Sequence, residues 1–267
     1  TLRMGDLGYT SNAQAGMDVC YNDLDEYIST LRSAILTPHA PYSQFDVMDN
    51  GERAQLNASL LQIENEYYSP IRPKRVAQSG EAPVVALARN GIEYVEVRCV
   101  DINPFMPFGI DADTIRFIYL FLLACLIDDS PQCDAEGQRQ NTINLQRMVN
   151  RGRENGLTLL SRQGVETSLS DLAEPILESM AAVAQWYDSQ YAGNDYQRVV
   201  DHARQQIRDP ELTLSARILR EMESAQQSFW QLALRYSREW HTQHLSDAMP
   251  DATWQLMTRE AEASLQR

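Results

Sequence analysis

The pattern of apolar residues in this chain changes close to Asp111. Residues 1–110 mix turn residues with short strand-like runs, whereas almost all of residues 111–267 show the 3.6-residue apolar spacing of helices. Strands gathered in one part of a chain and helices in the other are typical of an α+β fold. We therefore expect an antiparallel sheet within residues 1–110 and a mainly helical supporting region at 111–267.

Several stretches have the apolar spacing of helices. In Asn22–Leu36 the apolar stripe follows a possible Asn22 cap and ends before a proline. Asp111 could cap a second helix that is apolar nearly all round, so we expect this helix to be packed on several sides. A third helix should end near Gly152 or Gly156. Further helices are expected at about 170–191, 194–207 and 214–227.

The chain is acidic, with 37 Asp and Glu residues, 23 Lys and Arg residues and a formal net charge of -14. This balance repels phosphate backbones, and no basic run with interleaved aromatic residues offsets it, so we expect no nucleic-acid partner. The longest apolar run, Phe117–Ile127, falls short of the roughly 20 residues that span a bilayer, so we expect no membrane partner. Cys20, Cys99, Cys125 and Cys133 lack metal-binding spacing, which indicates reduced thiols and a cytoplasmic protein.

One strand-like run, "GIEYVEVRCVDINPF", carries a carboxylate and a guanidinium two residues apart. Side chains with this spacing share a strand face, so Glu96 and Arg98 project together, and Val95 and Val97 project to the opposite, core face. A carboxylate is a ligand for Mg²⁺, and a guanidinium matches phosphate oxygens. The pair fits a cavity that holds metal and phosphate, and an ordinary ion pair on a half-exposed sheet is the alternative.

A second polar cluster is "QIENEYYSPIRPKR". It combines Asn65 and Tyr68 with Lys74 and Arg75, and its two prolines argue against regular structure. The run Leu56–Tyr68 is expected to pair as a strand. Asn65 and Tyr68 have opposite parity in such a strand, so they can share a site only where the strand ends or bulges. A salt-bridged surface loop is the alternative interpretation.

The amino-terminal block "TLRMGDLGY" places Arg3 and Tyr9 on either side of Gly5 and Gly8. The two glycines suit a flexible or tightly turned segment. The block lacks both common phosphate-loop motifs, so on its own it indicates little about function.

Taken in this order, these blocks resemble bacterial glutamate-cysteine ligase, also called γ-glutamylcysteine synthetase. The resemblance rests on "TLRMGDLGYT", "LQIENEYYSPIRPKR", "GIEYVEVRCVDINPF" and "LTLSARIL", extends from Thr1 to about Arg220 and fades beyond it. In that family the "TLRM" block follows an upstream half, and this chain starts at that block without an initiator Met. The chain therefore resembles a carboxy-terminal portion of the family.

The resemblance implies an activity and a fold. The activity is the ATP-dependent ligation of the γ-carboxylate of L-glutamate to the amino group of L-cysteine, through a γ-glutamyl phosphate, which is the first step of glutathione biosynthesis. The metal is Mg²⁺ or Mn²⁺. The fold is α+β: part of a glutamine synthetase-like antiparallel catalytic sheet, with the substrate and metal residues, followed by a mainly helical carboxy-terminal half.

The resemblance also implies roles for individual residues. Glu96 resembles the metal-ligating glutamate, and Arg98 resembles the arginine on the transferred phosphoryl group, which makes Arg98 the catalytic candidate. The substrate-binding candidates, chiefly for cysteine, are Arg3, Tyr9, Asn65 and Tyr68. Lys74 and Arg75 could hold nucleotide phosphates or could simply brace the loop.

The residues that the family carries upstream are absent from this chain. They include most of the metal-binding glutamates and much of the nucleotide site, so we expect the isolated chain to be inactive and to need the amino-terminal half of the same enzyme as its partner. A noncatalytic helical module, or a related carboxylate-amine ligase with a different amine acceptor, is the alternative.

Overall fold

A computed structural model describes this chain except for Tyr9, Thr10, Ala15, Asp18, Asp46, Asn50 and Arg267, together with the side chains of Asn12 and Asp49. Contacts divide the chain into two units, Thr1–Asp101 with Arg116–Leu212, and Ile102–Ile115 with Thr213–Arg267. These units are defined by compactness. The functional division at residues 1–110 and 111–267 therefore stays a prediction.

The first hundred residues of the first unit form two helices and two short strand pairs. Their elements are α1 (Leu24–Leu36), β1 (Met48–Asp49), β2 (Glu52–Arg53), β3 (Ile71–Lys74), α2 (Pro83–Asn90) and β4 (Tyr94–Val97), with a 3₁₀ helix at Glu64–Glu66. Each strand pair is antiparallel. The expected sheet is therefore present as small two-stranded pairs.

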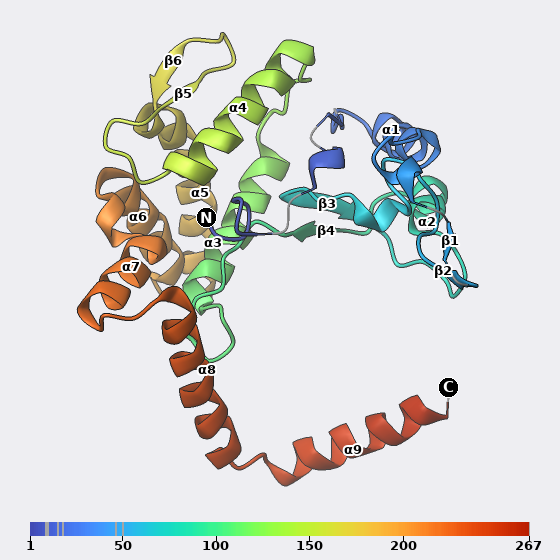
Figure 1. The fold of residues 1–267 in the computed structure, drawn as a ribbon. Coiled ribbons are helices and arrows are strands. Elements are labelled where there is room, and N and C mark those ends of the chain that lie inside the picture. The colour runs from blue at the N-terminus through green and yellow to red at the C-terminus, as the bar shows by residue number, and fades with distance from the viewer. Residues whose placement is uncertain (9–10, 15, 18, 46, 50, 267) are drawn as a thin grey trace. The chain divides into compact units, whose positions relative to one another are not determined.

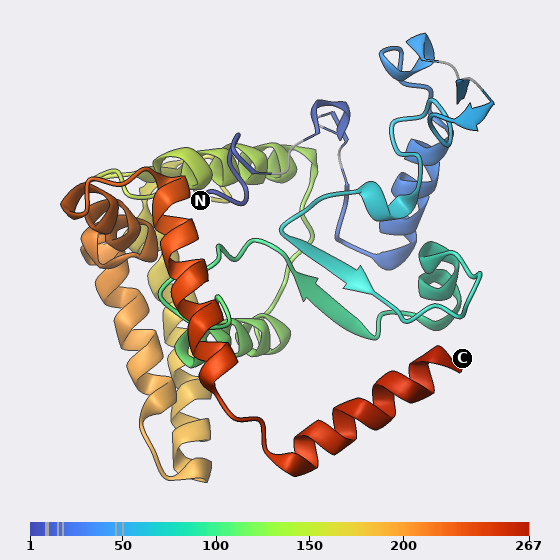
Figure 2. The ribbon, with the colours of Figure 1, turned by 60° about the horizontal axis from the view of Figure 1, so that its bottom comes forward.

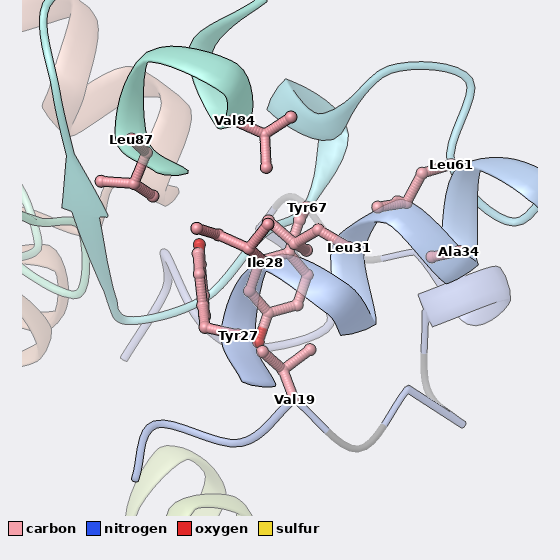
Figure 3. Packing of buried hydrophobic residues seen from close by; sticks show 9 residues of the cluster. All are labelled: Val19, Tyr27, Ile28, Leu31, Ala34, Leu61, Tyr67, Val84 and Leu87. Atoms are coloured by element: carbon pink, nitrogen blue, oxygen red, sulfur yellow. The ribbon is translucent and has the colours of Figure 1, made fainter. Parts of the chain in front are cut away.

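Helix α1 supplies most of the core of this region. The structure confirms the predicted helix but begins it one residue later, because Asp23 rather than Asn22 accepts the capping hydrogen bond from Glu26 N, at 2.8 Å. Tyr27, Ile28 and Leu31 of the stripe are buried. They pack with side chains from the loop before β3 and from α2, as Figure 3 shows: Leu61, Tyr67, Val84 and Leu87.

The predicted strand at Leu56–Tyr68 is wrong. Side chains in this run take over backbone groups, since the amide oxygen of Asn57 accepts from Ser59 N at 2.9 Å and a carboxylate oxygen of Glu66 accepts from Gln62 N at 2.7 Å. Such local bonds compete with strand pairing. The strand begins later, at Ile71.

The expectation that prolines exclude regular structure near Arg75 is also wrong, because β3 contains Pro73. Each strand of a two-stranded pair has a free edge, and a proline lacking an N–H is tolerated there. The predicted strand around Glu96 is confirmed as β4, which pairs with β3.

The rest of the first unit is mainly helical. It contains α3 (Ala112–Ile127), α4 (Ala135–Arg151), the hairpin β5 (Thr158–Leu160) and β6 (Glu166–Ser168), α5 (Leu169–Tyr191) and α6 (Asp195–Arg208). Helices α5 and α6 run side by side (Figure 1), and their core contains Met180, Ala184 and Val200. These helices were predicted from spacing, whereas the β5–β6 hairpin was not.

Helix α3 differs from its prediction. Asp111 caps it as predicted, accepting from Thr114 N at 2.7 Å. Only one side is covered by described residues, however, because Leu120 is fully buried while Leu126 and Ile127 are 80% and 71% exposed. Within the part of the chain that the structure describes, no helix is both long and apolar enough to cross a bilayer.

The second unit packs the segment after β4 against later helices. Those helices are α7 (Leu214–Ser224), α8 (Phe229–Ser246) and α9 (Asp251–Leu265), and α8 leads into α9 through a short connection (Figure 2). Phe105 is buried against Ile218 and Leu232, and the Arg217 guanidinium lies over its ring, 3.7 Å from the centroid. This core supports the segment that follows the site strand.

Candidate functional site

One face of the β3–β4 pair gathers charged side chains. In the antiparallel register Arg72 lies opposite Glu96, and Lys74 lies opposite Tyr94. Residues directly opposite each other project to the same face, as do residues two apart in one strand. Arg72, Lys74, Glu96 and Arg98 therefore project to a common face, which we call the charged face.

Glu96 lies between two cations on the charged face. Its Oε1 is 3.1 Å from Arg98 Nε, and its Oε2 is 3.8 Å from Lys74 Nζ. Neither approach has the geometry of a hydrogen bond, and both Glu96 Oε2 and Arg98 Nε are buried atoms without a hydrogen-bond partner among the described residues. A buried carboxylate oxygen normally has such a partner. Glu96 Oε2 is thus a candidate ligand for a cation.

The pKa of Lys74 is lowered in its position on the charged face. Burial lowers the pKa of its ammonium most, and the nearby Arg72 and Arg98 guanidinium groups lower it further, while Glu96 opposes them. Three cations around one carboxylate therefore leave an excess of positive charge, which is suited to an anionic ligand.

Tyr68 lies beside Arg98. The Arg98 guanidinium carbon is 5.8 Å from the Tyr68 ring centroid, and Tyr68 N donates to Gln14 Oε1 at 2.9 Å. Asn65, three residues earlier, is exposed and belongs to the 3₁₀ helix Glu64–Glu66. Because this stretch is not a strand, the parity argument against a shared site no longer applies.

The amino-terminal segment reaches the end of β4. Arg3 Nε donates to the Arg98 carbonyl, and the carboxylate of Asp101 accepts from Arg3 N at 2.8 Å and from Thr1 Oγ1 at 2.7 Å. The structure thus brings Arg3 and Arg98 together. Tyr9, the other candidate in this block, lies outside the described residues.

Arg75 makes contacts that brace the backbone. Its Nη1 donates to the Asn90 carbonyl at 3.1 Å, and its Nε is 3.5 Å from Glu93 Oε2. These contacts join the residue after β3 to the end of α2 and to the turn before β4. Arg75 also lines a small cavity with Lys74 and Arg72, so the two interpretations of Arg75 stay open.

Sequence reasoning missed three residues that hold this region together: Gln14, Arg72 and Asp101. Arg72 stood in the second polar cluster, but only the β3–β4 register reveals that it lies opposite Glu96. Asp101 comes three residues after Arg98, and only its contacts show that it fastens the chain's first residues. Gln14 carries no recognisable sequence signal.

A metal ion would find one ligand here. Glu96 Oε2 fits that role because it is buried and has no hydrogen-bond partner. No group of three or more His, Cys, Asp or Glu side chains suited to a metal occurs among the described residues. Among the described residues of this face, Glu96 is therefore a candidate for a single metal ligand.

Comparisons with known proteins agree on one family. Residues 1–148 match the family model described as glutamate-cysteine ligase. The chain is 48% identical over 239 residues to a glutamate–cysteine ligase of Pseudomonas paraeruginosa, covering 90% of this chain and 45% of that protein. With the Azotobacter vinelandii ligase the identity is 45% over 267 residues, covering 99% and 50%. The chain spans about half the length of these curated relatives.

Two solved structures share the fold. The crystal structure of glutamate–cysteine ligase from Francisella tularensis in complex with AMP has a TM-score of 0.89 and 33% identity, covering 100% of this chain and 52% of that chain. A bifunctional glutathione synthetase from Pasteurella multocida has a TM-score of 0.60 and 20% identity, covering 90% and 27%, and shows the fold alone. The predicted fold class, part of a glutamine synthetase-like antiparallel sheet followed by a mainly helical half, is confirmed.

Proposed function

Because this chain belongs to the glutamate-cysteine ligase family, we propose that it supplies part of a site that ligates L-glutamate to L-cysteine with ATP. In this reaction ATP phosphorylates the γ-carboxylate of glutamate. The amino group of cysteine then attacks the acyl phosphate, releases phosphate and forms the γ-peptide bond. Phosphoryl transfer of this kind depends mainly on positioning and on charge stabilisation.

The observation that carries the proposal is the charged face. Glu96 has a buried oxygen without a hydrogen-bond partner, and Arg98 and Lys74 lie 3.1 and 3.8 Å from its two oxygens. A phosphoryl group in transfer carries dispersed negative charge, which cations held in place stabilise without further reorganisation. Arg98 would take this role with its fork of donors.

Glu96 would contribute one ligand to Mg²⁺ or Mn²⁺. The ion, when bound, supplies charge neutralisation at the phosphoryl oxygens. The carboxylate also keeps Arg98 oriented through their ion pair. The remaining ligands of the metal ion would come from the amino-terminal half of the enzyme, since the described residues hold no group of three suitable side chains.

The amino-acid substrate would lie near Tyr68 and Arg3. Tyr68 lies against Arg98, and Arg3 donates to the Arg98 carbonyl, so both are close to the proposed phosphoryl site. Together with Tyr9 and Asn65, they could hold the carboxylate of cysteine and so supply proximity for the attack.

Lys74 and Arg75 are the candidates for nucleotide phosphates. The position of the Lys74 ammonium supports this role, because it adds positive charge to the charged face. The AMP complex of the Francisella tularensis ligase supports ATP as co-substrate. A cytoplasmic location follows from the same proposal, and it is supported by four cysteines that are all free.

The test is an assay of ADP release and of the γ-peptide product. Four samples are compared: this chain, the amino-terminal half of the same enzyme, their mixture, and both joined in one polypeptide. We expect no turnover from either half and ATP-, glutamate- and cysteine-dependent turnover from the joined protein. A joined protein that folds but forms no γ-peptide would contradict the proposal and favour the noncatalytic module. Turnover with another amine, but not with cysteine, would favour the related ligase.

A further inference from the structure

Among the described residues Arg72 is the one charged residue that is buried, with 3% of its surface exposed. Burying a guanidinium is unfavourable unless good partners compensate for its lost hydration. Backbone groups pair β3 with β4, so a lysine or a neutral residue at this position could form the same strand pair. The burial of Arg72 therefore calls for a role that depends on its donors.

The donors of Arg72 hold the loop that precedes β3. Its Nη1 donates to the Asn65 carbonyl at 3.2 Å, and its Nη2 donates to the Glu64 carbonyl at 3.4 Å. Both carbonyls belong to the 3₁₀ helix Glu64–Glu66. One planar guanidinium thus ties two successive peptide groups of the loop to β3, which a single ammonium cannot reproduce.

A second contact holds the other side of the same loop. Gln14 Nε2 donates to the Glu66 carbonyl at 2.8 Å, and Gln14 Oε1 accepts from Tyr68 N at 2.9 Å. The backbone around Asn65 and Tyr68 is therefore fixed from two directions. The Arg72 contacts tie the Glu64 and Asn65 carbonyls of this loop to β3, in the strand pair that carries Glu96.

Arg72 also lies where the loop and the charged face meet. It is opposite Glu96 in the register, and it lines a cavity with Tyr27, Asn65 and Lys74. Its charge acts on these neighbours, because it lowers the pKa of Lys74 and opposes the rise that burial causes in the pKa of Tyr27. Its Nε is buried without a hydrogen-bond partner among the described residues.

We propose that Arg72 is a positioning residue, which sets the places of Asn65 and Tyr68 relative to Glu96 and Arg98. The inference rests on the proposed function, in which Asn65 and Tyr68 bind the amino-acid acceptor. Arg72 would act on acceptor binding through the loop and would not touch the acceptor itself.

The first experiment uses this chain and needs no activity. Hydrogen–deuterium exchange is measured in Arg72→Lys and in Arg72→Met, which removes the donors without burying an unpaired ammonium. We expect amides of residues 64–68 to exchange about tenfold faster in both variants, and α1 amides to exchange at the unchanged rate. Arg89→Lys is the matched control, because Arg89 is an exposed arginine paired with Glu81. If Arg72→Lys fails to fold, Arg72→Met decides. Unchanged exchange at residues 64–68 in a folded variant would overturn the proposal.

The second experiment uses the joined ligase. Arg72→Lys should raise KM for cysteine about tenfold and leave kcat within about threefold, because misplaced binding groups weaken the acceptor's hold. An unchanged KM, or a fall in kcat alone, would overturn the positioning role while the proposed function stands. If the unsubstituted joined ligase forms no γ-peptide, the proposed function fails, and faster exchange at 64–68 still supports the loop contact.

Discussion

On the β3–β4 pair, a charged residue of one face is buried more deeply than a valine of the opposite face, the reverse of what side-chain chemistry predicts. On the charged face Arg72 is only 3% exposed, whereas Val95 on the other face is 43% exposed. Val95 and Val97 were expected to form the core face. That expectation is wrong for Val95 among the described residues.

This difference in burial distinguishes a face that is held by contacts within the chain from a face that those contacts leave partly uncovered. The charged face is held by contacts within the chain, through Arg72, Lys74 and the ion pair of Glu96 with Arg98. The opposite face carries Val95 and Val97, and we call it the valine face. At Val95 it exposes apolar area that would normally be buried. The proposed function requires an amino-terminal half to complete the enzyme, and under that proposal we expect this half to cover the valine face.

Arg98→Lys should have the largest effect. In the joined ligase we expect kcat to fall by about 100- to 1000-fold, because an ammonium cannot reproduce the fork of donors on a phosphoryl group. The circular dichroism spectrum should not change. Arg89→Lys, measured in parallel, should keep normal turnover. Near-normal turnover in Arg98→Lys would show that Arg98, on the charged face, does not stabilise the transferred phosphoryl group.

Glu96→Gln should have the next largest effect. The amide keeps the shape of the side chain but loses the charge that attracts a divalent cation, so the Mg²⁺ concentration for half-maximal activity should rise by at least about tenfold. Glu166→Gln is the matched control, because Glu166, on the β5–β6 hairpin, is ion-paired with Arg147 of α4. An unchanged Mg²⁺ dependence would mean that Glu96 pairs with Lys74 and Arg98 but does not bind the metal ion.

Val95→Lys tests the uncovered face. In this chain alone the free energy of unfolding should change by less than about 0.5 kcal/mol, because Val95 is already largely in contact with solvent. In the mixture with the amino-terminal half, the buried lysine should weaken association about tenfold or more. Calorimetric titration of one half with the other measures this, and an equal effect of Val95→Lys and Arg89→Lys would show that the valine face stays open.

Apolar spacing and capping residues predicted several of the helices. The stripes of α1 and α5 and the Asp111 cap of α3 are local features, and the structure keeps them. The loop before β3 could not be predicted in this way, because Asn57 and Glu66 bond to backbone groups and displace strand pairing. Burial of α3 and of the valine face depends on groups beyond the local pattern.

The site was predictable in part for a similar reason. Strand alternation places Glu96 and Arg98 on one face without any knowledge of the fold. The approach of Arg3 to Arg98 spans 95 positions of sequence, and the resemblance, not the spacing, associated them. Arg72 looked like a surface charge in a polar cluster, since burial of a guanidinium is visible only when its carbonyl partners are known.

Lys74→Gln should have the smallest effect, and it tests the charge excess on the charged face. Burial first, and then Arg72 and Arg98, lower the pKa of Lys74 below its usual value of 10.5, and Glu96 opposes this. Between the lowered pKa and 10.5 the unfolded chain holds more protons than the folded chain, so raising the pH through this window favours folding. Below the window Lys74 is charged in both states, and its full destabilising contribution is present.

Urea unfolding at several pH values should therefore show the parent chain gaining stability relative to Lys74→Gln as the pH rises toward 10.5. A difference between parent and variant that is constant with pH would mean that the charged face imposes no cost on Lys74, and the two faces would then differ in burial alone.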